Sequence, residues 1–216
     1  MASGTKREGR AGQLLLVAVA LAAWAGVVLQ VRLSVHLAGL HGRPAWHGIT
    51  DALSYFTVLT NLLVAVVASL RLARGEAFPA IRAVLAATAV YILVVGLVYA
   101  VLLRGLWAPT GLQRLADVLL HDVVPLLYVA WWLACAPRGG LRPGQVPRWL
   151  LYPLAYYGFT LLLGATTGRY LYPFANVHTL GLTRVIWNGG LLLLLFLGLG
   201  ALAVLFDGLG APRRGG

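Results

Sequence analysis

Six long runs of apolar residues dominate this sequence and restrict what it can fold into. They cover 13–35, 51–72, 80–103, 115–136, 149–167 and 187–206. Each run is close to the roughly 20 residues that an α-helix needs to cross the hydrocarbon core of a bilayer. The sequence therefore predicts an all-α, polytopic membrane protein, in which a bundle of six transmembrane helices forms one domain over 13–207.

The composition excludes several other classes of protein. Only 11% of the residues are charged, against about 25% in soluble chains. The net charge of +11 comes from small basic clusters between the apolar runs, without the basic face of a nucleic-acid-binding protein, so we expect no nucleic-acid partner. A single cysteine, Cys135, allows neither an intrachain disulfide nor a cysteine-based zinc site. One histidine firmly inside a span, His121, is too few for a diheme cytochrome. We expect no metal and no cofactor.

The basic residues also predict the orientation of the chain. With six spans, 11 of the 17 Lys and Arg residues fall on the side that holds both termini, and 6 fall on the other side. Cytoplasmic loops carry the excess of positive charge, so both termini are expected in the cytoplasm and the protein in the cell membrane. The tails, 1–12 and 208–216, are expected to be basic and disordered. An alternative interpretation of the first run is a cleaved signal peptide, although it exceeds the usual apolar region of about 7–15 residues.

Polar residues collect at one depth of two predicted spans. The second run carries Thr57, Thr60 and Asn61 on one helical stripe, and the fourth carries His121 with Asp117 and Asp122. Both stripes lie about 9 Å below the outer surface, counting 1.5 Å per residue. Ionisable groups in the membrane are costly and are a functional hypothesis by default. We therefore expect a pocket that opens toward the outer leaflet.

The order of residues in the fourth run predicts its local geometry. Asp117 and His121 are four residues apart and can touch, whereas Asp122 points about 100° away. A carboxylate on one imidazole nitrogen fixes the tautomer and leaves the other nitrogen as a base. Pro125 cannot donate a hydrogen bond to the carbonyl of residue 121, so the helix should loosen beside the histidine.

Further polar residues are expected near the same leaflet, namely Arg169, Asn176 and His178. Each residue also has a simpler interpretation. Threonines in membrane helices commonly hydrogen-bond within or between helices, and Asp117 in a first helical turn interacts favourably with the helix dipole.

A threonine facing a histidine can form a nucleophile–base pair that attacks an acyl carbon. A site at this depth would be reached from the acyl chains, so the expected partners are membrane lipids and the expected substrate is a lipid ester. Asn61 and Arg169 are candidate donors to the oxyanion. The alternatives are a small transporter or proton-handling protein, and a non-enzymatic membrane subunit.

Three segments carry a resemblance to a known family: YFTVLTN in the second run, LLHDVVPLLYVAWWL in the fourth, and LYPFANVHTLG before the sixth. The chain resembles a family of bacterial six-helix membrane proteins, distantly similar to the androgen-induced and androgen-dependent TFPI-regulating proteins. Those relatives are intramembrane threonine hydrolases of fatty acid esters of hydroxy fatty acids. The resemblance implies that His121 is the catalytic histidine and Thr57 the nucleophile, with Thr60 as the alternative.

Overall fold

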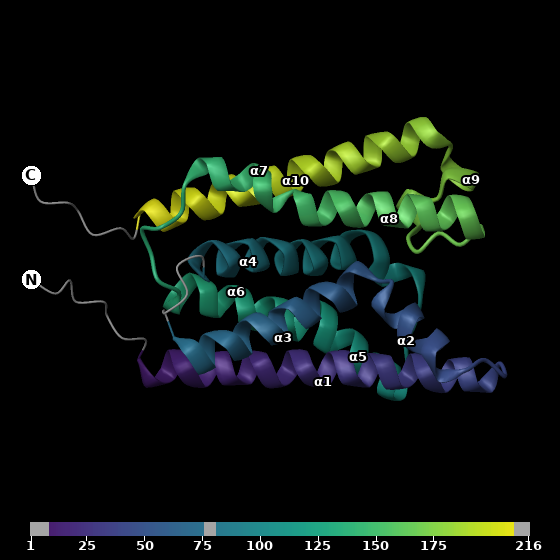
Figure 1. Cartoon of the computed structure of the whole chain (residues 1–216), viewed down its shortest axis with the longest axis horizontal. Helices are drawn as coiled ribbons and strands as arrows, with labels where there is room; N and C mark the ends of the chain where they lie inside the picture. The colour runs from purple at the N-terminus through teal and green to yellow at the C-terminus, as the bar shows by residue number, and fades with distance from the viewer. Residues whose placement is uncertain (1–8, 76–80, 210–216) are drawn as a thin grey trace, which may run out of the picture. The chain divides into compact units, whose positions relative to one another are not determined.

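The structure is a computed structural model that describes residues 9–75 and 81–209 (Figure 1). It divides into two compact units, residues 1–137 and 138–216. The described residues form helices and no strand. Five helices are long and apolar enough to cross a membrane: Arg10–Leu40, Phe56–Arg74, Ile81–Leu106, Gly111–Cys135 and Leu182–Leu209. Most of the two predicted tails, 1–8 and 210–216, lies outside the described residues.

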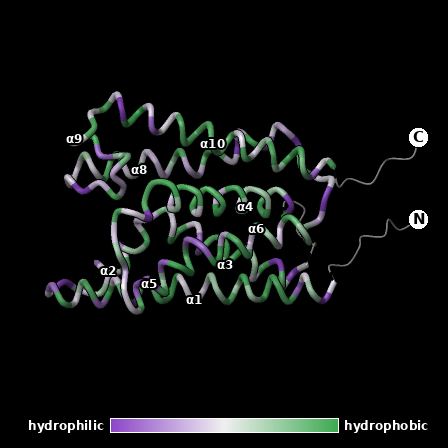
Figure 2. Tube along the Cα trace, turned by 180° about the vertical axis from the view of Figure 1, so that it is seen from behind, coloured by the Kyte–Doolittle hydropathy of each residue, from purple (hydrophilic) through white to green (hydrophobic). Residues whose placement is uncertain are grey.

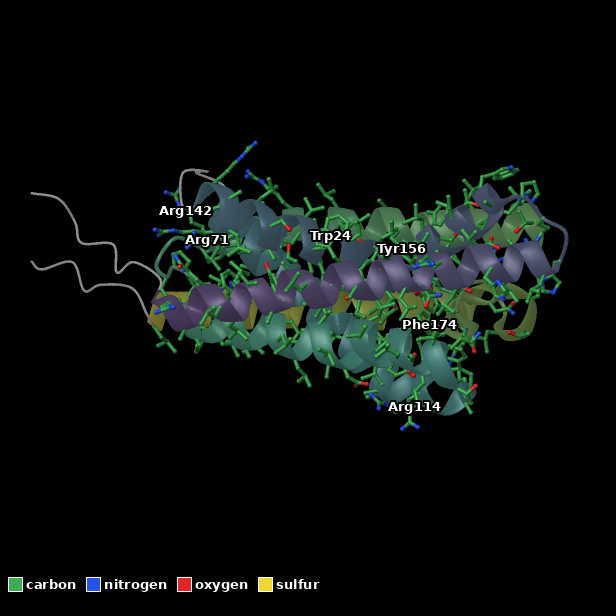
Figure 3. All side chains as sticks on the ribbon, turned by 90° about the horizontal axis from the view of Figure 1, so that it is seen from below. Trp24, Arg71, Arg114, Arg142, Tyr156 and Phe174 are labelled. Carbon is green, nitrogen blue, oxygen red and sulfur yellow. The ribbon has the colours of Figure 1, made fainter. Side chains whose placement is uncertain are left out.

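Four of these five long helices belong to the first unit, and each runs antiparallel to the one before it (Figure 1). Its elements are α1 (Arg10–Leu40), α2 (Ala45–Leu53), α3 (Phe56–Arg74), α4 (Ile81–Val98), η1 (Tyr99–Leu103), η2 (Arg104–Leu106), α5 (Gly111–Val118), η3 (Leu119–Val123) and α6 (Val124–Cys135). Hydrophobic residues cover most of the length of the long helices (Figure 2). Arg71 and Arg114 lie at opposite ends of the unit (Figure 3).

Helix α1 is longer than a membrane is thick. Its 31 residues extend about 46 Å, against a hydrocarbon core of about 30 Å. The short helix α2 packs against its C-terminal part, and the contact requires a glycine. A Cβ atom on Gly48 would lie 2.4 Å from the Cα of Val35. The chain therefore folds back along α1 before it enters the next long helix.

The second predicted run is divided between two helices. Asp51 belongs to α2 and forms an ion pair with Arg43 at 3.4 Å. Tyr55 is extended, with φ −86° and ψ 133°, and α3 begins at Phe56. Thr57 is therefore the second residue of its helix, whereas the sequence placed it six residues inside one.

The third and fourth runs each contain a π-helical turn. The turn η1 interrupts the helix that runs to Leu106, and η3 interrupts the helix from Gly111 to Cys135. Helix α4 passes close to η3, because a Cβ atom on Gly96 would lie 3.3 Å from the carbonyl oxygen of His121 and 3.2 Å from the Cβ of Pro125. These two irregular turns position the polar residues of the third and fourth runs.

The second unit contains η4 (Pro143–Gln145), α7 (Val146–Trp149), α8 (Leu151–Thr167), η5 (Pro173–Ala175), α9 (Val177–Leu180) and α10 (Leu182–Leu209). Helices α8 and α10 pack where the Tyr157 ring covers Gly189, since a Cβ atom there would lie 2.7 Å from the ring. Near the end of α10, the buried carboxylate of Asp207 accepts hydrogen bonds from the main-chain N–H groups of Gly140 and Leu141, both at 2.9 Å.

Candidate functional site

A proline and an asparagine shape the π turn that carries the histidine. The N–H of Val124 bonds to the carbonyl of Leu119, in the π register, and residue 125 is a proline that has no N–H. The Leu120 carbonyl therefore has no partner within its own helix. The side chain of Asn61, on α3, donates to it at 3.0 Å. The helix loosens before Pro125, as predicted, but the carbonyl that a side chain of the neighbouring helix satisfies is that of Leu120 and not that of residue 121.

Asn61 is fully buried and has no hydrogen-bond donor left for a substrate. Its amide nitrogen carries two protons. One is donated to Leu120 and the other to the main-chain oxygen of Thr57 at 2.8 Å. The structure thus gives Asn61 a role in joining α3 to η3.

Asp117 and His121 contact each other, as their spacing of four residues predicts. The imidazole Nδ1 lies 3.0 Å from the main-chain oxygen of Asp117 and 3.1 Å from its Oδ1. The main-chain oxygen is only an acceptor, so Nδ1 must carry the proton. That single proton points at the main chain, which is why Oδ1 is within ion-pair distance yet has no aligned hydrogen bond. In the neutral ring, Nε2 is then left with its lone pair.

The free nitrogen of His121 is the chemically available group of the site. Among the described residues, the imidazole contacts Asp117 and the ring of Tyr99, and Nε2 accepts no hydrogen bond. Its side chain is 14% exposed and that of Asp117 is 8% exposed. An imidazole held through Nδ1, with an unoccupied Nε2, is the arrangement of a general base.

Tyr99 contacts both members of this pair. Its hydroxyl donates to Oδ2 of Asp117 at 2.5 Å. Its ring stacks on the His121 ring, with centroids 3.8 Å apart and planes inclined by 16°. The guanidinium of Arg104 lies 5.1 Å from the centroid of the same tyrosine ring. Tyr99 belongs to the third predicted run, where Tyr91 and Tyr99 are the two phenols that could contribute to a site.

Asp122 points away from the histidine and forms an ion pair with Arg104. The side chain of Arg104 is 52% exposed and that of Asp122 is 31% exposed. Sequence reasoning missed Arg104 as a partner, because it counted this arginine only as a basic residue of an outer loop.

The π turn of the third run explains how Tyr99 and Arg104 come to act together. Residues five apart, such as these two, lie about 140° apart on an α-helix. A π turn, whose hydrogen bonds join residues five apart, brings them close to one face. The N–H of Arg104 bonds to the carbonyl of Tyr99 in this register. Tyr99 and Arg104 therefore both reach the neighbouring helix, where they contact Asp117 and Asp122.

Neither candidate threonine is hydrogen-bonded to His121. Thr57 is half-buried, and its hydroxyl makes no hydrogen bond within the described part of the chain, whereas Thr60 is fully buried. The residue of η3 that faces α3 is Leu120, which packs with Val27 and Val58. His121 follows it by about 100° around the helix and faces Tyr99. The structure therefore brings Asn61, and not a threonine, to the turn that carries the histidine.

The three predicted supporting residues of the outer loop belong to the second unit and have local contacts there. The main-chain N–H of Arg169 donates to the Thr167 hydroxyl at 3.2 Å. The side chain of Asn176 caps α9 by accepting from the N–H groups of His178 and Thr179, at 3.0 and 3.3 Å. The His178 ring packs edge-on against Tyr170, with centroids 5.1 Å apart.

Within residues 9–75 and 81–209, no group of three His, Cys, Asp or Glu side chains is arranged to hold a metal ion. Comparison of the chain with models of protein families, with curated proteins and with solved structures finds no match. A function for this chain therefore has to be inferred from the geometry around His121.

Proposed function

We propose that this protein is an intramembrane hydrolase of lipid esters in which His121 is the general base. The observation that carries the proposal is the available Nε2 of an imidazole whose Nδ1 is held by Asp117. Both groups lie in a helix long and apolar enough to span a membrane. A substrate that reaches them from the bilayer is a lipid, and an ester is the lipid bond that a general base and a nucleophile cleave.

The nucleophile in this proposal is the hydroxyl of Thr57. His121 Nε2 takes its proton, the threonine oxygen attacks the ester carbonyl, and the protonated imidazole returns the proton to the leaving alcohol. A water molecule, deprotonated by His121, then attacks the acyl-threonine. The bond to the threonine oxygen breaks, the imidazolium returns the proton to that oxygen, and the fatty acid leaves. Thr57 is preferred over Thr60 because its hydroxyl has no hydrogen-bond partner in the described structure and is less buried. Thr57 and His121 are not hydrogen-bonded in the structure, so this proposal requires substrate binding to bring them together, as catalytic hydrogen bonds often form only in the substrate complex.

A lipid-tailed fluorophosphonate probe tests this proposal directly, since it labels an activated hydroxyl covalently. Purified wild-type protein should be labelled, and Thr57→Ala and His121→Ala should each abolish labelling. Thr60→Ala is the matched control and should keep it. If His121→Ala abolishes ester hydrolysis while no threonine is labelled, the nucleophile is a water molecule. A folded wild-type protein with neither labelling nor hydrolysis would contradict the proposal.

We also propose that α8 is a sixth span and that both termini are cytoplasmic, with the protein in the cell membrane. Helix α8 has 17 residues, about 26 Å, slightly less than the hydrocarbon thickness. With α7 and Leu150 the helical segment covers 146–167, about 33 Å. Helix α8 itself contains no charged residue. Six spans also place the larger share of the arginines on the cytoplasmic side.

A second candidate function is proton handling. It is supported by the three titratable side chains Tyr99, Asp117 and His121, which contact one another between two helices long and apolar enough to span a membrane. Hydrogen-bonded sets of this kind are used as proton relays in membrane proteins. A proton flux across liposomes that His121→Ala abolishes, in the absence of ester hydrolysis, would favour this function.

A further inference from the structure

Tyr99 occupies a special place in the candidate site because it touches the carboxylate and the imidazole at the same time. Its hydroxyl donates to Oδ2 of Asp117 at 2.5 Å, and its ring lies parallel to that of His121 at 3.8 Å. The tyrosine itself is only 4% exposed. It therefore links the two side chains from within the buried part of the unit.

The two contacts restrict different motions. The hydrogen bond holds the Asp117 carboxylate, whose other oxygen lies beside Nδ1 of His121. The parallel ring blocks rotation of the imidazole about the bond that joins it to the side chain. Rotation by a half turn would exchange Nδ1 with Cδ2 and Nε2 with Cε1, so the ring would lose its hydrogen bond to Asp117 and would present a carbon where the free nitrogen lies.

Tyr99 is in turn held by its own helix. The η1 turn begins at this residue, the N–H of Arg104 bonds to its carbonyl, and the Arg104 guanidinium lies 5.1 Å from the ring centroid. Arg104 is anchored by its ion pair with Asp122, on the same η3 turn as the histidine. The tyrosine ring is therefore flanked by the imidazole and the guanidinium.

We propose that Tyr99 is a positioning residue that fixes the orientation and tautomer of His121 through Asp117 and through ring stacking. The expected effect of Tyr99 on turnover rests on the proposed hydrolase function. The orientation of the imidazole is a property of the protein whether or not it hydrolyses an ester. The two parts are therefore tested by separate measurements.

The first measurement is the nitrogen NMR spectrum of histidine-labelled protein in detergent micelles, with the His121 signals assigned by their loss in His121→Gln. The wild type should show one neutral tautomer, protonated at Nδ1. Tyr99→Leu removes the hydroxyl and the ring, so it should give a mixture of tautomers. Tyr99→Phe removes the hydroxyl alone, keeps the stack and should give a smaller change. Tyr128→Phe is the matched control, because Tyr128 is fully buried and donates to the main-chain oxygen of Leu85 at 3.2 Å.

The second measurement is hydrolysis of a long-chain 4-nitrophenyl ester in mixed micelles. Tyr99→Leu should lower kcat by about 10- to 100-fold, because a catalytic group misplaced by about 1 Å can cost 100-fold in rate, and should change KM less than about twofold. The kcat of Tyr99→Phe should lie between those of Tyr99→Leu and the wild type, and the kcat of Tyr128→Phe should equal that of the wild type. If Tyr99→Leu fails to fold, the comparison of Tyr99→Phe with Tyr128→Phe still tests whether Tyr99 positions His121.

An unchanged tautomer in the folded Tyr99 variants overturns the proposal, even if kcat falls, because the tyrosine would then act on the substrate and not through the histidine. If the wild type hydrolyses no ester, the proposed hydrolase function fails, and the NMR measurement alone decides the role of Tyr99.

Discussion

At the scale of single residues, the chemistry of the site depends on which nitrogen of His121 is free. The main-chain oxygen and the carboxylate of Asp117 both lie beside Nδ1. The main-chain oxygen accepts the Nδ1 proton, and the stacked ring of Tyr99 lies against the imidazole in this orientation. In the proposed hydrolysis, the carboxylate stabilises the imidazolium that forms when Nε2 accepts a proton.

Asp117→Asn should therefore reduce turnover while leaving the fold intact. The amide retains the shape of the carboxylate but lacks its charge, so the protonated imidazole loses its counter-ion. We expect kcat for the 4-nitrophenyl ester to fall on the order of 100-fold, with little change in the midpoint of unfolding.

The control for this variant is Asp51→Asn, which makes the same chemical change in the exposed ion pair of α2. It should leave kcat unchanged. Equal losses in the two variants, or full activity of Asp117→Asn, would contradict the assigned role of the carboxylate.

At the scale of helices, the sequence predicts contacts within one helix better than the angle at which a helix faces its neighbour. The spacing of Asp117 and His121 correctly predicts that they touch, because a helix places such residues one turn apart. The expected meeting of His121 with Thr57 depends on the rotation of the fourth run about its axis. That rotation is set by the packing of Leu120 against Val27 and Val58 and by the π turn, and neither can be read from a regular period of 3.6 residues.

Pro125 and Asn61 should be energetically coupled through the Leu120 carbonyl. In the wild type, Asn61→Ala leaves this buried oxygen without a donor, and we expect a loss of about 1–3 kcal/mol in the free energy of unfolding. Pro125→Ala restores an N–H that can bond to the same carbonyl. In the Pro125→Ala background, the loss in the free energy of unfolding caused by Asn61→Ala should be smaller than in the wild type by about 0.5–1.5 kcal/mol.

A double-mutant cycle in detergent, with unfolding driven by added dodecyl sulfate, measures this coupling. The four proteins are the wild type, the two single variants and the double variant. Strictly additive losses would mean that the π turn is held by other contacts and that Asn61 does not replace the hydrogen bond lost at Pro125.

The close contact of Gly48 with α1 leads to a second prediction at this scale. Gly48→Leu would force α2 away from α1, because its Cβ would lie 2.4 Å from the Cα of Val35. We expect a loss of about 1–3 kcal/mol in the free energy of unfolding. Gly39→Leu is the matched control on α1, since a Cβ there has no atom within 4 Å. A stable Gly48→Leu protein would show that α2 is not anchored where the structure places it.

At the scale of the whole molecule, the number of spans decides on which side of the membrane each terminus lies. The composition of the sequence is enough to predict a helical membrane protein, because its apolar runs allow little else. The composition does not determine the number of spans, because α8 is only about 26 Å long and is separated from α7 at Leu150. Five spans would put the termini on opposite sides, and six would put them on the same side.

Reporter fusions in a bacterial host distinguish these two arrangements. Green fluorescent protein at either terminus should fluoresce, since it folds in the cytoplasm, and alkaline phosphatase at either terminus should be inactive. A cysteine introduced at Thr179, in α9, should react in intact cells with a maleimide that does not cross membranes. Native Cys135, at the end of α6, is the internal control and should remain unlabelled until the cells are opened. An active phosphatase at the C-terminus, together with an unreactive Thr179→Cys, would mean that α8 does not cross the membrane and would leave five spans.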